Sequence, residues 1–308
     1  MRIVQRVIAL AGLAVVAWIG VTSWGAIVHG HPLYGVLLVL TVAGCVWAGW
    51  RSFRDRPARH GWSLVLWIVL VVLGIGWIAL MAWLRPFPAV EPALTAMQST
   101  GTVEVVETPT SITLLPGLDM SSTGVFFQPG ARVDARAYAA ILRPLADAGH
   151  PVVIAKQPLG IGFLAPGAFE AARDANPDVT SWIVGGHSLG GTVAAMDAEE
   201  HGQDAAAPVD GLLLFASYPA SDMSASLTVP VLSISGSEDG LATPRDIDLS
   251  RADLPPSAQF TQIVGAVHAF FGDYGVQPGD GTATIDQDTA RSQIAKASLD
   301  FVDANRQG

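Results

Sequence analysis

Long apolar runs dominate the first 85 residues of the chain. No charged side chain occurs in Val7–Trp50, and the run is broken only by the polar turn His29–Pro32. This leaves apolar segments of 22 and 18 residues, Val7–Val28 and Leu33–Trp50, and a third uncharged segment of 23 residues, Trp62–Leu84. A helix needs about 20 residues to cross the ~30 Å hydrocarbon core of a bilayer. The pattern therefore predicts three transmembrane helices, at about 7–28, 33–50 and 62–84.

A secretory signal peptide is the competing interpretation of the N-terminus. Arg2 and Arg6 precede the first apolar segment, as basic residues precede the apolar region of a signal peptide. A cleaved leader would not explain the second and third segments, and the first segment is longer than the roughly 7–15 apolar residues of a leader. We therefore expect three retained helices.

The basic residues of the short loops predict the orientation of these helices. The segment Arg51–Gly61 contains four arginines and one aspartate, whereas the His29–Pro32 turn contains no arginine or lysine. Cytoplasmic loops carry the excess of basic residues, so the N-terminus and Arg51–Gly61 should be cytoplasmic. After three crossings, everything beyond Leu84 lies outside. We expect a multi-pass protein of the cell membrane with an extracytoplasmic C-terminal domain.

The pattern changes after a proline-rich segment, residues 86–100, which we expect to be a linker because its prolines cannot continue a helix. Short apolar strands then alternate with amphipathic helices, which is typical of a mostly parallel sheet covered by helices on both faces. The sequence thus predicts an α/β domain over residues 101–308, after a membrane domain at 1–85. The expected strands are Thr102–Glu107, Ser111–Leu115, Gly124–Phe127, Pro151–Ala155, Trp182–Val184, Gly211–Phe215, Val229–Ile234 and Phe260–Val264. The expected helices are Ala135–Ala148, Phe169–Ala175, Ser188–Glu200 and about Asp286–Asp303, the last with a capping box of Thr284 and Gln287.

Composition and charge separate the two halves further. Only 14% of the 308 residues are charged, against roughly 25% in a soluble domain. Residues 1–100 carry a net charge of +5 and residues 101–308 a net charge of −15. Phosphate backbones would repel the acidic half, so we expect no nucleic-acid partner. The single cysteine, Cys45, lies in the second apolar segment, which excludes disulfides and a thiol nucleophile from the outer domain.

A glycine-rich turn, Gly185–Gly191, joins the strand Trp182–Val184 to the following helix. Within it, Gly186-x-Ser188-x-Gly190 matches the nucleophile elbow, in which a serine lies on a strained strand-to-helix turn. The flanking glycines let neighbouring backbone approach without a clash at Cβ. Ser188 is therefore the candidate nucleophile.

An elbow of this kind requires an acid and then a histidine at later strand ends. Asp239 follows the strand Val229–Ile234, with Glu238 as a substitute, and His268 follows the strand Phe260–Val264. His268 could take the Ser188 proton while Asp239 orients the imidazole. The alternative for each residue taken singly is structural: a capping serine, a turn aspartate and a buried histidine.

The oxyanion formed in acyl transfer needs two preorganised N–H groups. We expect one from Leu189, directly after the nucleophile, and the other from Ala131, in the loop after the strand Gly124–Phe127. An ordinary Pro-Gly turn is the alternative for that loop. His187, inside the elbow, is interpreted as a packing or supporting residue.

We expect no metal site and no cofactor. Three acidic residues near the C-terminus, Asp280, Asp286 and Asp288, lack the spacing of a calcium loop, and a solvated loop is the simpler interpretation. His29-Gly30-His31 offers too few ligands for a metal.

The sequence resembles the α/β-hydrolase superfamily, specifically its membrane-anchored bacterial members, over roughly Gly101 to Phe301. The resemblance rests on Gly185–Gly191, Ser233–Pro244 and Gly265–Gly281. It implies an eight-stranded type of sheet and a triad of Ser188, Asp239 and His268. Such proteins are often labelled as similar to dienelactone hydrolases, which use a cysteine where this chain has serine. The short segment Ala216–Leu227 leaves no room for a large lid.

These observations predict a membrane-anchored serine hydrolase that cleaves an ester-like carbonyl through an acyl-enzyme on Ser188. The expected partners are a small-molecule or lipid-like ester and the membrane lipids. Two alternatives remain open. One is acyl transfer to an alcohol or lipid headgroup, and the other is a catalytically silent binding module on the same fold.

Overall fold

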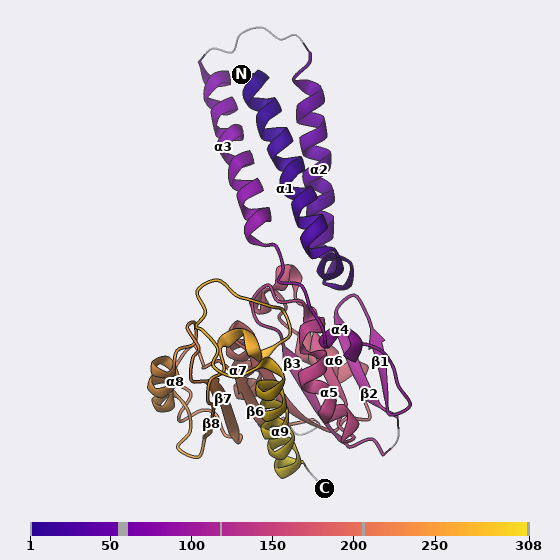
Figure 1. The fold of residues 1–308 in the computed structure, drawn as a ribbon, viewed down its shortest axis with the longest axis vertical. Coiled ribbons are helices and arrows are strands. Elements are labelled where there is room, and N and C mark those ends of the chain that lie inside the picture. The colour runs from indigo at the N-terminus through magenta and orange to yellow at the C-terminus, as the bar shows by residue number, and fades with distance from the viewer. Residues whose placement is uncertain (1, 55–60, 118, 205–206, 307–308) are drawn as a thin grey trace. The chain divides into compact units, whose positions relative to one another are not determined.

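The computed structural model describes residues 2–54, 61–117, 119–204 and 207–306 (Figure 1). The chain forms two compact units, Met1–Pro86 and Phe87–Gly308. The first unit consists of three helices, α1 (Arg2–His29), α2 (Pro32–Arg51) and α3 (Trp62–Trp83). All three are long and apolar enough to cross a membrane. Of the arginines used for the orientation, Arg56 and Arg59 lie outside the described residues.

Most side chains of these helices point outward although they are apolar. Only one residue of α3, Met81, is buried, whereas large side chains such as Leu66, Leu70 and Leu73 are exposed. Such a helix would be unstable in water, because its apolar surface has no protein neighbour to cover it. A bilayer supplies the missing apolar surroundings, and the three helices fit a transmembrane bundle.

The second unit is built on one eight-stranded sheet with the order β1-β2-β4-β3-β5-β6-β7-β8. Its first two strands pair antiparallel to each other, and β2 also pairs antiparallel to β4; all the other pairs are parallel. The strands are β1 (Val103–Glu107), β2 (Ser111–Pro116), β3 (Thr123–Gln128), β4 (Val152–Ala155), β5 (Ser181–His187), β6 (Val209–Phe215), β7 (Val231–Gly236) and β8 (Gln259–Ile263). The central strands β3, β4 and β5 are buried along their whole length, as parallel strands covered on both faces must be.

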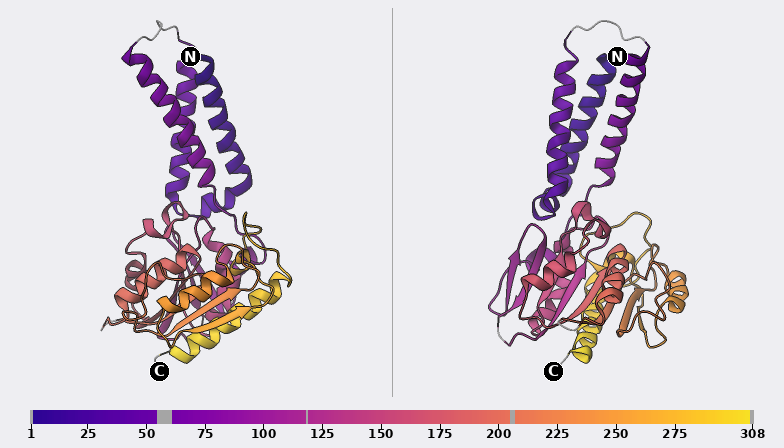
Figure 2. Two further views of the ribbon diagram at one scale, coloured as in Figure 1. Left: turned by 90° about the vertical axis from the view of Figure 1, so that its left-hand side faces the viewer. Right: turned by 180° about the vertical axis from the view of Figure 1, so that it is seen from behind.

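Two apolar clusters lie on the two faces of this sheet. One unites strand residues such as Val125 and Leu213 with α5 (Ala139–Asp147) and α9 (Gln287–Asn305). The other unites Phe126 and Leu212 with α6 (Ala168–Ala175) and α7 (Leu189–His201). Because successive strand residues point to opposite faces, neighbours in sequence enter different clusters. The result is the predicted helix–sheet–helix arrangement, which Figure 2 shows from two further sides.

The proline-rich segment after α3 belongs mostly to the second unit. Phe87 forms a parallel bridge with Val133, and its N–H donates to the carbonyl of Arg132 at 2.8 Å. A short helix, α4 (Ala93–Ala96), follows. The segment that we interpreted as a linker is therefore hydrogen-bonded to the loop after β3.

Three local features differ from the expectations. The expected helix Ala135–Ala148 begins as a 3-10 turn and becomes α-helical only at Ala139. The cap of α9 is Asp286, whose carboxylate accepts from the Thr289 N–H at 2.8 Å. Thr284 and Gln287 do not form the expected capping box, because the cap is Asp286 and the Gln287 side chain donates instead to the Gly272 carbonyl and to Asp273.

The third difference is a helix that the sequence analysis omitted, α8 (Pro244–Ser250). Thr243 and Asp246 cap it reciprocally, since each side chain accepts from the other residue's backbone N–H. This capping box with proline at the first helical position was visible in the sequence.

Candidate active site

Four loops at one edge of the sheet carry the residues that the sequence singles out. The parallel strands β3, β5, β7 and β8 end at this edge, because the carboxyl ends of parallel strands coincide. Ala131 follows β3, Ser188 follows β5, Asp239 follows β7 and His268 follows β8. In open α/β sheets this edge is where ligands bind.

The turn at Ser188 has the strained geometry expected of a nucleophile elbow. Its backbone adopts φ 53° and ψ −126°, a region that non-glycine residues avoid. The Ser188 N–H donates to the carbonyl of Phe215 at 3.0 Å, which holds the turn against the end of β6. Its hydroxyl makes no capping bond to α7, and the residue is partly exposed. A strained, accessible serine with an unengaged hydroxyl is suited to attack a ligand.

Close backbone contacts on both sides of the turn require glycine. A Cβ on Gly186 would overlap the Gly190 backbone, and a Cβ on Gly190 would overlap the carbonyl oxygens of Gln128 and Pro129. The first turn of α7 is thus packed directly on the loop after β3.

Asp239 and His268 form a buried hydrogen-bonded pair. The distance between His268 Nδ1 and Asp239 Oδ2 is 2.9 Å, and both side chains are at most 1% exposed. The other carboxylate oxygen, Oδ1, accepts from the N–H groups of Leu241 and Ala242, each at 2.8 Å. These three hydrogen bonds hold the carboxylate in place, so that Nδ1–H of the imidazole faces it and Nε2 is left for another partner.

The Nε2 atom of His268 is buried and has no hydrogen-bond partner among the described residues. The structure therefore joins the predicted acid and base but forms no hydrogen bond between His268 and Ser188. Catalytic hydrogen bonds are often long in structures without substrate.

The structure also separates the two neighbouring acids. Glu238 is exposed, and its carboxylate accepts from the Ser237 hydroxyl at 3.1 Å. Asp239 points inward, so it and not Glu238 contacts the histidine.

Two backbone N–H groups near Ser188 are unengaged. Neither the Leu189 nor the Ala131 amide has a hydrogen-bond partner within the described part of the chain. The loop that carries Ala131 is held from both sides, because Arg132, at φ 61°, donates its N–H to Gly160 and Val133 donates to Gly130. These are the two amides that the sequence analysis chose for an oxyanion.

His187, which we interpreted as a packing or supporting residue, forms a pair with Tyr138, which the sequence did not single out, and the pair supports this loop. The Tyr138 hydroxyl accepts from the Gly130 N–H at 2.9 Å and lies 2.8 Å from His187 Nδ1. The ring of His187 lies against that of His268, with 4.5 Å between centroids. Burial, together with the charge that His268 can carry, holds the pKa of His187 well below its ordinary value. His187 therefore stays neutral and packs between the loop after β3 and the histidine loop.

A second buried polar chain runs beneath the same loop. Gln157 donates to the Gln128 side chain at 2.8 Å and to the Pro129 carbonyl at 3.3 Å, and Gln128 donates to Asp197 at 3.3 Å. Burial raises the pKa of Asp197 to about 6, although the hydrogen bond from Gln128 opposes this rise. Nothing in the local sequence pattern distinguishes these three residues, because their contacts join β3, the segment after β4 and α7.

The third omission is Asp280, which we interpreted as part of a solvated loop. Its carboxylate accepts the backbone N–H groups of Gly240, His268, Ala269 and Gly281 at 2.7–3.2 Å. It thereby links the acid loop to the histidine loop. The signal for it was the Gly-Asp-Gly turn at the end of Gly265–Gly281.

One group of potential metal ligands occurs within the described residues, away from the strand ends discussed above. Donor atoms of Glu170, Glu200 and His201 lie within 4.8 Å of one another. His201 is already engaged by Asp204 at 3.0 Å, and Asp204 pairs with Arg173 at 2.7 Å. The group is satisfied as a surface ion-pair network.

The sheet order, the serine elbow and the Asp–His pair together define an α/β-hydrolase fold. Comparison with family models agrees: the model of the alpha/beta hydrolase family matches residues 124–292. The chain belongs to this family. No curated protein sequence matches the chain significantly.

Solved structures are similar to this chain at low sequence identity. A dienelactone hydrolase from Anabaena variabilis is 17% identical, with a TM-score of 0.51, and the match covers 67% of this chain and all of the other. A thermophilic esterase from Thermogutta terrifontis is 14% identical, with a TM-score of 0.45, and the match covers 65% and 91% of the two chains. At 17% identity the likeness to the dienelactone hydrolase concerns the fold alone.

Proposed function

We propose that the chain is a membrane-anchored serine hydrolase that cleaves an ester-like carbonyl, in a small-molecule or lipid-like substrate, through an acyl-enzyme on Ser188. The observation that carries the proposal is the buried Asp239–His268 pair, whose outer imidazole nitrogen is unpartnered. A buried polar atom without a partner costs free energy, so such an atom is commonly reserved for function. The strained Ser188, at the end of β5 on the same edge of the sheet, supplies the hydroxyl that this nitrogen would serve.

The reaction follows from these groups. The Ser188 oxygen attacks the carbonyl carbon, its proton passes to His268 Nε2, and the carbonyl electron pair moves onto oxygen. Collapse of this tetrahedral intermediate expels the alcohol, which takes the proton from His268. A water then attacks the acyl-enzyme by the same steps, giving its proton to His268, and releases the acid and free Ser188.

Asp239 stabilises the imidazolium that forms in each half-reaction and fixes the imidazole tautomer. The unengaged N–H groups of Leu189 and Ala131 would receive the oxyanion. Because neither amide has a partner among the described residues, both could donate without breaking a bond found there.

Covalent labelling with a fluorophosphonate tests this proposal. A serine hydroxyl is a weak nucleophile at neutral pH unless a base removes its proton, so a merely structural serine would not react. We expect the wild type to be labelled, Ser188→Ala to lose all labelling and His268→Ala to lose most of it. Ser233→Ala is the control, because the Ser233 hydroxyl is buried in β7 without a partner, and it should be labelled normally. A folded wild type that never reacts would favour the silent binding module.

Acyl transfer is separated from hydrolysis by the product. With a labelled ester substrate in vesicles, hydrolysis releases the free acid, and water oxygen enters it. Recovery of the acyl group on an alcohol or a lipid headgroup would show that the protein is an acyltransferase and not a hydrolase.

The proposal includes a cytoplasmic N-terminus and an extracytoplasmic hydrolase domain. It is supported by the four arginines of the Arg51–Gly61 segment and by the lack of arginine and lysine in the His29–Pro32 turn. A reporter that is active only in the cytoplasm should be silent when fused after residue 308. The same reporter fused within Arg51–Gly61 should be active. The opposite pattern would show that the hydrolase domain is cytoplasmic.

A further inference from the structure

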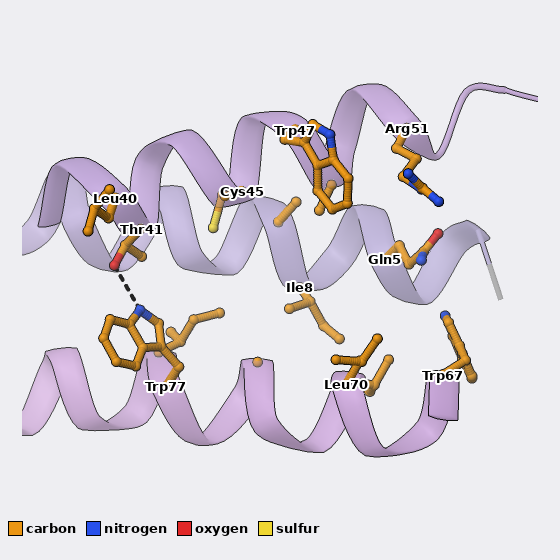
Figure 3. A pocket seen from close by; sticks show the side chains of 16 residues that line it. Gln5, Ile8, Leu40, Thr41, Cys45, Trp47, Arg51, Trp67, Leu70 and Trp77 are labelled. Atoms are coloured by element: carbon orange, nitrogen blue, oxygen red, sulfur yellow. Dashed lines mark hydrogen bonds between the residues drawn. The ribbon is translucent and has the colours of Figure 1, made fainter. Parts of the chain in front are cut away.

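The three membrane helices line a cavity within the first unit that is partly open to the outer surface of the bundle. Its volume is about 410 Å³, and it lies between α1, α2 and α3 (Figure 3). Apolar side chains such as Ile8, Leu70 and Ile78 form its walls. Small-molecule sites in proteins have volumes of roughly 300–1,000 Å³, so the cavity is large enough to hold part of a ligand.

Only one end of the cavity carries a charged side chain. Figure 3 shows Gln5, Arg51 and Trp67 grouped there, each from a different helix. The Trp67 indole nitrogen is buried and has no hydrogen-bond partner in the described part of the chain. Toward the other end, by contrast, the Trp77 indole donates to the Thr41 hydroxyl at 2.8 Å (Figure 3). The bundle satisfies one indole internally and leaves the other facing the cavity.

The side chains at this end of the cavity are suited to a ligand group that accepts hydrogen bonds. An indole nitrogen and a guanidinium can only donate hydrogen bonds, and the amide of Gln5 can donate two. Arg51 also supplies a positive charge. A phosphate or carboxylate oxygen, which accepts and is negative, is the complementary group.

The length of the cavity matches one leaflet of a bilayer. Along α2 its lining runs from Leu40 to Arg51, which at 1.5 Å per residue is about 16 Å. Half of the ~30 Å hydrocarbon core is about 15 Å. The end that carries Arg51 coincides with the ends of the helices, where lipid headgroups lie and where basic side chains attract anionic lipids.

We propose that this cavity binds one acyl chain of an anionic amphiphile. The chain lies among the apolar walls, and its phosphate or carboxylate is held by Gln5, Arg51 and Trp67. The proposal rests on insertion of the three helices into a membrane, and it is independent of the hydrolytic reaction. With the topology proposed above, the ligand comes from the cytoplasmic leaflet.

Two glycines that line the cavity allow it to be filled selectively. A Cβ added at Gly44 on α2 or at Gly74 on α3 would meet no atom within 4 Å. A leucine at either position can therefore extend into the open space without moving the backbone. Gly76, two residues from Gly74 on the same helix, is equally unobstructed but does not line the cavity. Gly76→Leu is thus a matched control for Gly74→Leu.

The test is photocrosslinking of the full-length chain in phosphatidylcholine vesicles. Three probes carry the same diazirine-labelled acyl chain: phosphatidylglycerol, the free fatty acid and phosphatidylcholine. Cross-linked peptides are mapped by mass spectrometry. We expect one or both anionic probes to label lining residues of α2 and α3, and their relative yields identify a phosphate or a carboxylate ligand.

Gly74→Leu and Gly44→Leu should each reduce this labelling by about tenfold, because the leucine side chain occupies space that the acyl chain of the probe needs. Gly76→Leu should be labelled like the wild type. Arg51→Gln should lower labelling by the anionic probes about fivefold, whereas Arg54→Gln, which removes an equal charge outside the cavity lining, should not.

Equal labelling of Gly74→Leu and Gly76→Leu would overturn the proposal. The proposal would also be overturned if the phosphatidylcholine probe labelled the wild type as strongly as both anionic probes do. Helix content by circular dichroism verifies that each variant is folded. Fluorophosphonate labelling of Ser188 in the same samples should be unchanged, so failure of this proposal and failure of the hydrolase are distinguishable.

Discussion

Asp280 accepts the backbone N–H of His268, with 3.1 Å between Oδ1 and the nitrogen. Its other oxygen accepts from the Ala269 N–H at 2.8 Å, and Oδ1 also receives the Gly240 N–H at 3.2 Å. One carboxylate therefore fixes the backbone on both sides of the Asp239–His268 hydrogen bond. It contacts no side-chain atom of that pair in the described interactions, so we regard Asp280 as a positioning residue.

Asp280→Ala should lower turnover by about 100-fold, because small displacements of a catalytic group have effects of that size. The KM should change little, since no substrate contact is removed. Asp280→Asn retains one acceptor oxygen and should recover part of the loss. The measurement is steady-state hydrolysis of an ester substrate by the full chain in detergent.

Asp288→Asn is the matched control, because Asp288 is an exposed acid of the same region, paired with Arg291 at 2.7 Å. Its turnover should equal that of the wild type. If Asp280→Ala and Asp280→Asn are both as active as Asp288→Asn, then Asp280 does not position the histidine loop.

The neighbouring acids Asp239 and Glu238 should differ sharply on substitution. Asp239→Asn removes the carboxylate that faces His268 Nδ1, and loss of the orienting aspartate costs about 10⁴ in turnover in serine proteases. We expect a fall of the same order here. Glu238→Gln alters an exposed side chain and should leave turnover within about twofold of the wild type. The rate of fluorophosphonate labelling of Ser188 is measured for both variants. A larger effect of Glu238→Gln than of Asp239→Asn would show that Asp239 is not the acid that orients His268.

Much of the sheet could be predicted from the sequence because its signals are local. A buried parallel strand is a short apolar run, and the runs that contain Val125, Ile183 and Ile234 occur where β3, β5 and β7 lie. The elbow at Ser188 is equally local, since its glycines and its serine are contiguous. Asp239 and His268 could be named because each lies in the short loop that follows a predicted strand.

Residues whose role depends on contacts between distant segments could not be predicted in this way. Asp280 lies 12 residues after His268 in a loop without regular structure, and only the folded loop turns its carboxylate onto the histidine backbone. Tyr138 meets His187 from 49 residues away. In the membrane unit, three separate helices bring Gln5, Arg51 and Trp67 to one end of a cavity. The apolar pattern within each helix does not show which residues of the other helices it meets, so this grouping could not be predicted.

Gly190 should be far more sensitive to substitution than an ordinary loop glycine. In Gly190→Ala the new Cβ overlaps the carbonyl oxygens of Gln128 and Pro129, which are backbone atoms and cannot rotate away. We expect a loss of about 1–3 kcal/mol in the free energy of unfolding and displacement of the loop that carries Ala131. Thermal unfolding and the rate of fluorophosphonate labelling measure the two effects.

Gly101→Ala is the control for this substitution, because a Cβ at Gly101 meets no atom within 4 Å. It should unfold and react like the wild type. Equal stability and equal labelling of the two variants would show that α7 is not packed on the loop after β3 as described.

Asp197 should destabilise the hydrolase unit at neutral pH. Its pKa rises from 3.8 to about 6 on folding, mainly through burial, so between these values the folded state holds a proton that the unfolded state has released. The free energy of unfolding therefore falls as pH increases from about 4 to 6 and stays lower above pH 6. A shift of two units corresponds to at most about 3 kcal/mol. Asp197→Asn cannot ionise and keeps an oxygen for the Gln128 amide.

Asp197→Asn should thus be more stable than the wild type at pH 7.5, by about 1–3 kcal/mol, and indistinguishable from it near pH 4. Denaturant unfolding of the full chain in detergent at both pH values gives the two differences. Asp300→Asn, which removes an exposed carboxylate paired with Lys296, should change stability by less than about 0.5 kcal/mol at either pH. An Asp197→Asn variant that gains nothing at pH 7.5, or gains equally at pH 4, would show that the buried carboxylate does not bind its proton more tightly in the folded state. The pH dependence separates this electrostatic cause from a general improvement in packing, which would stabilise the variant at every pH.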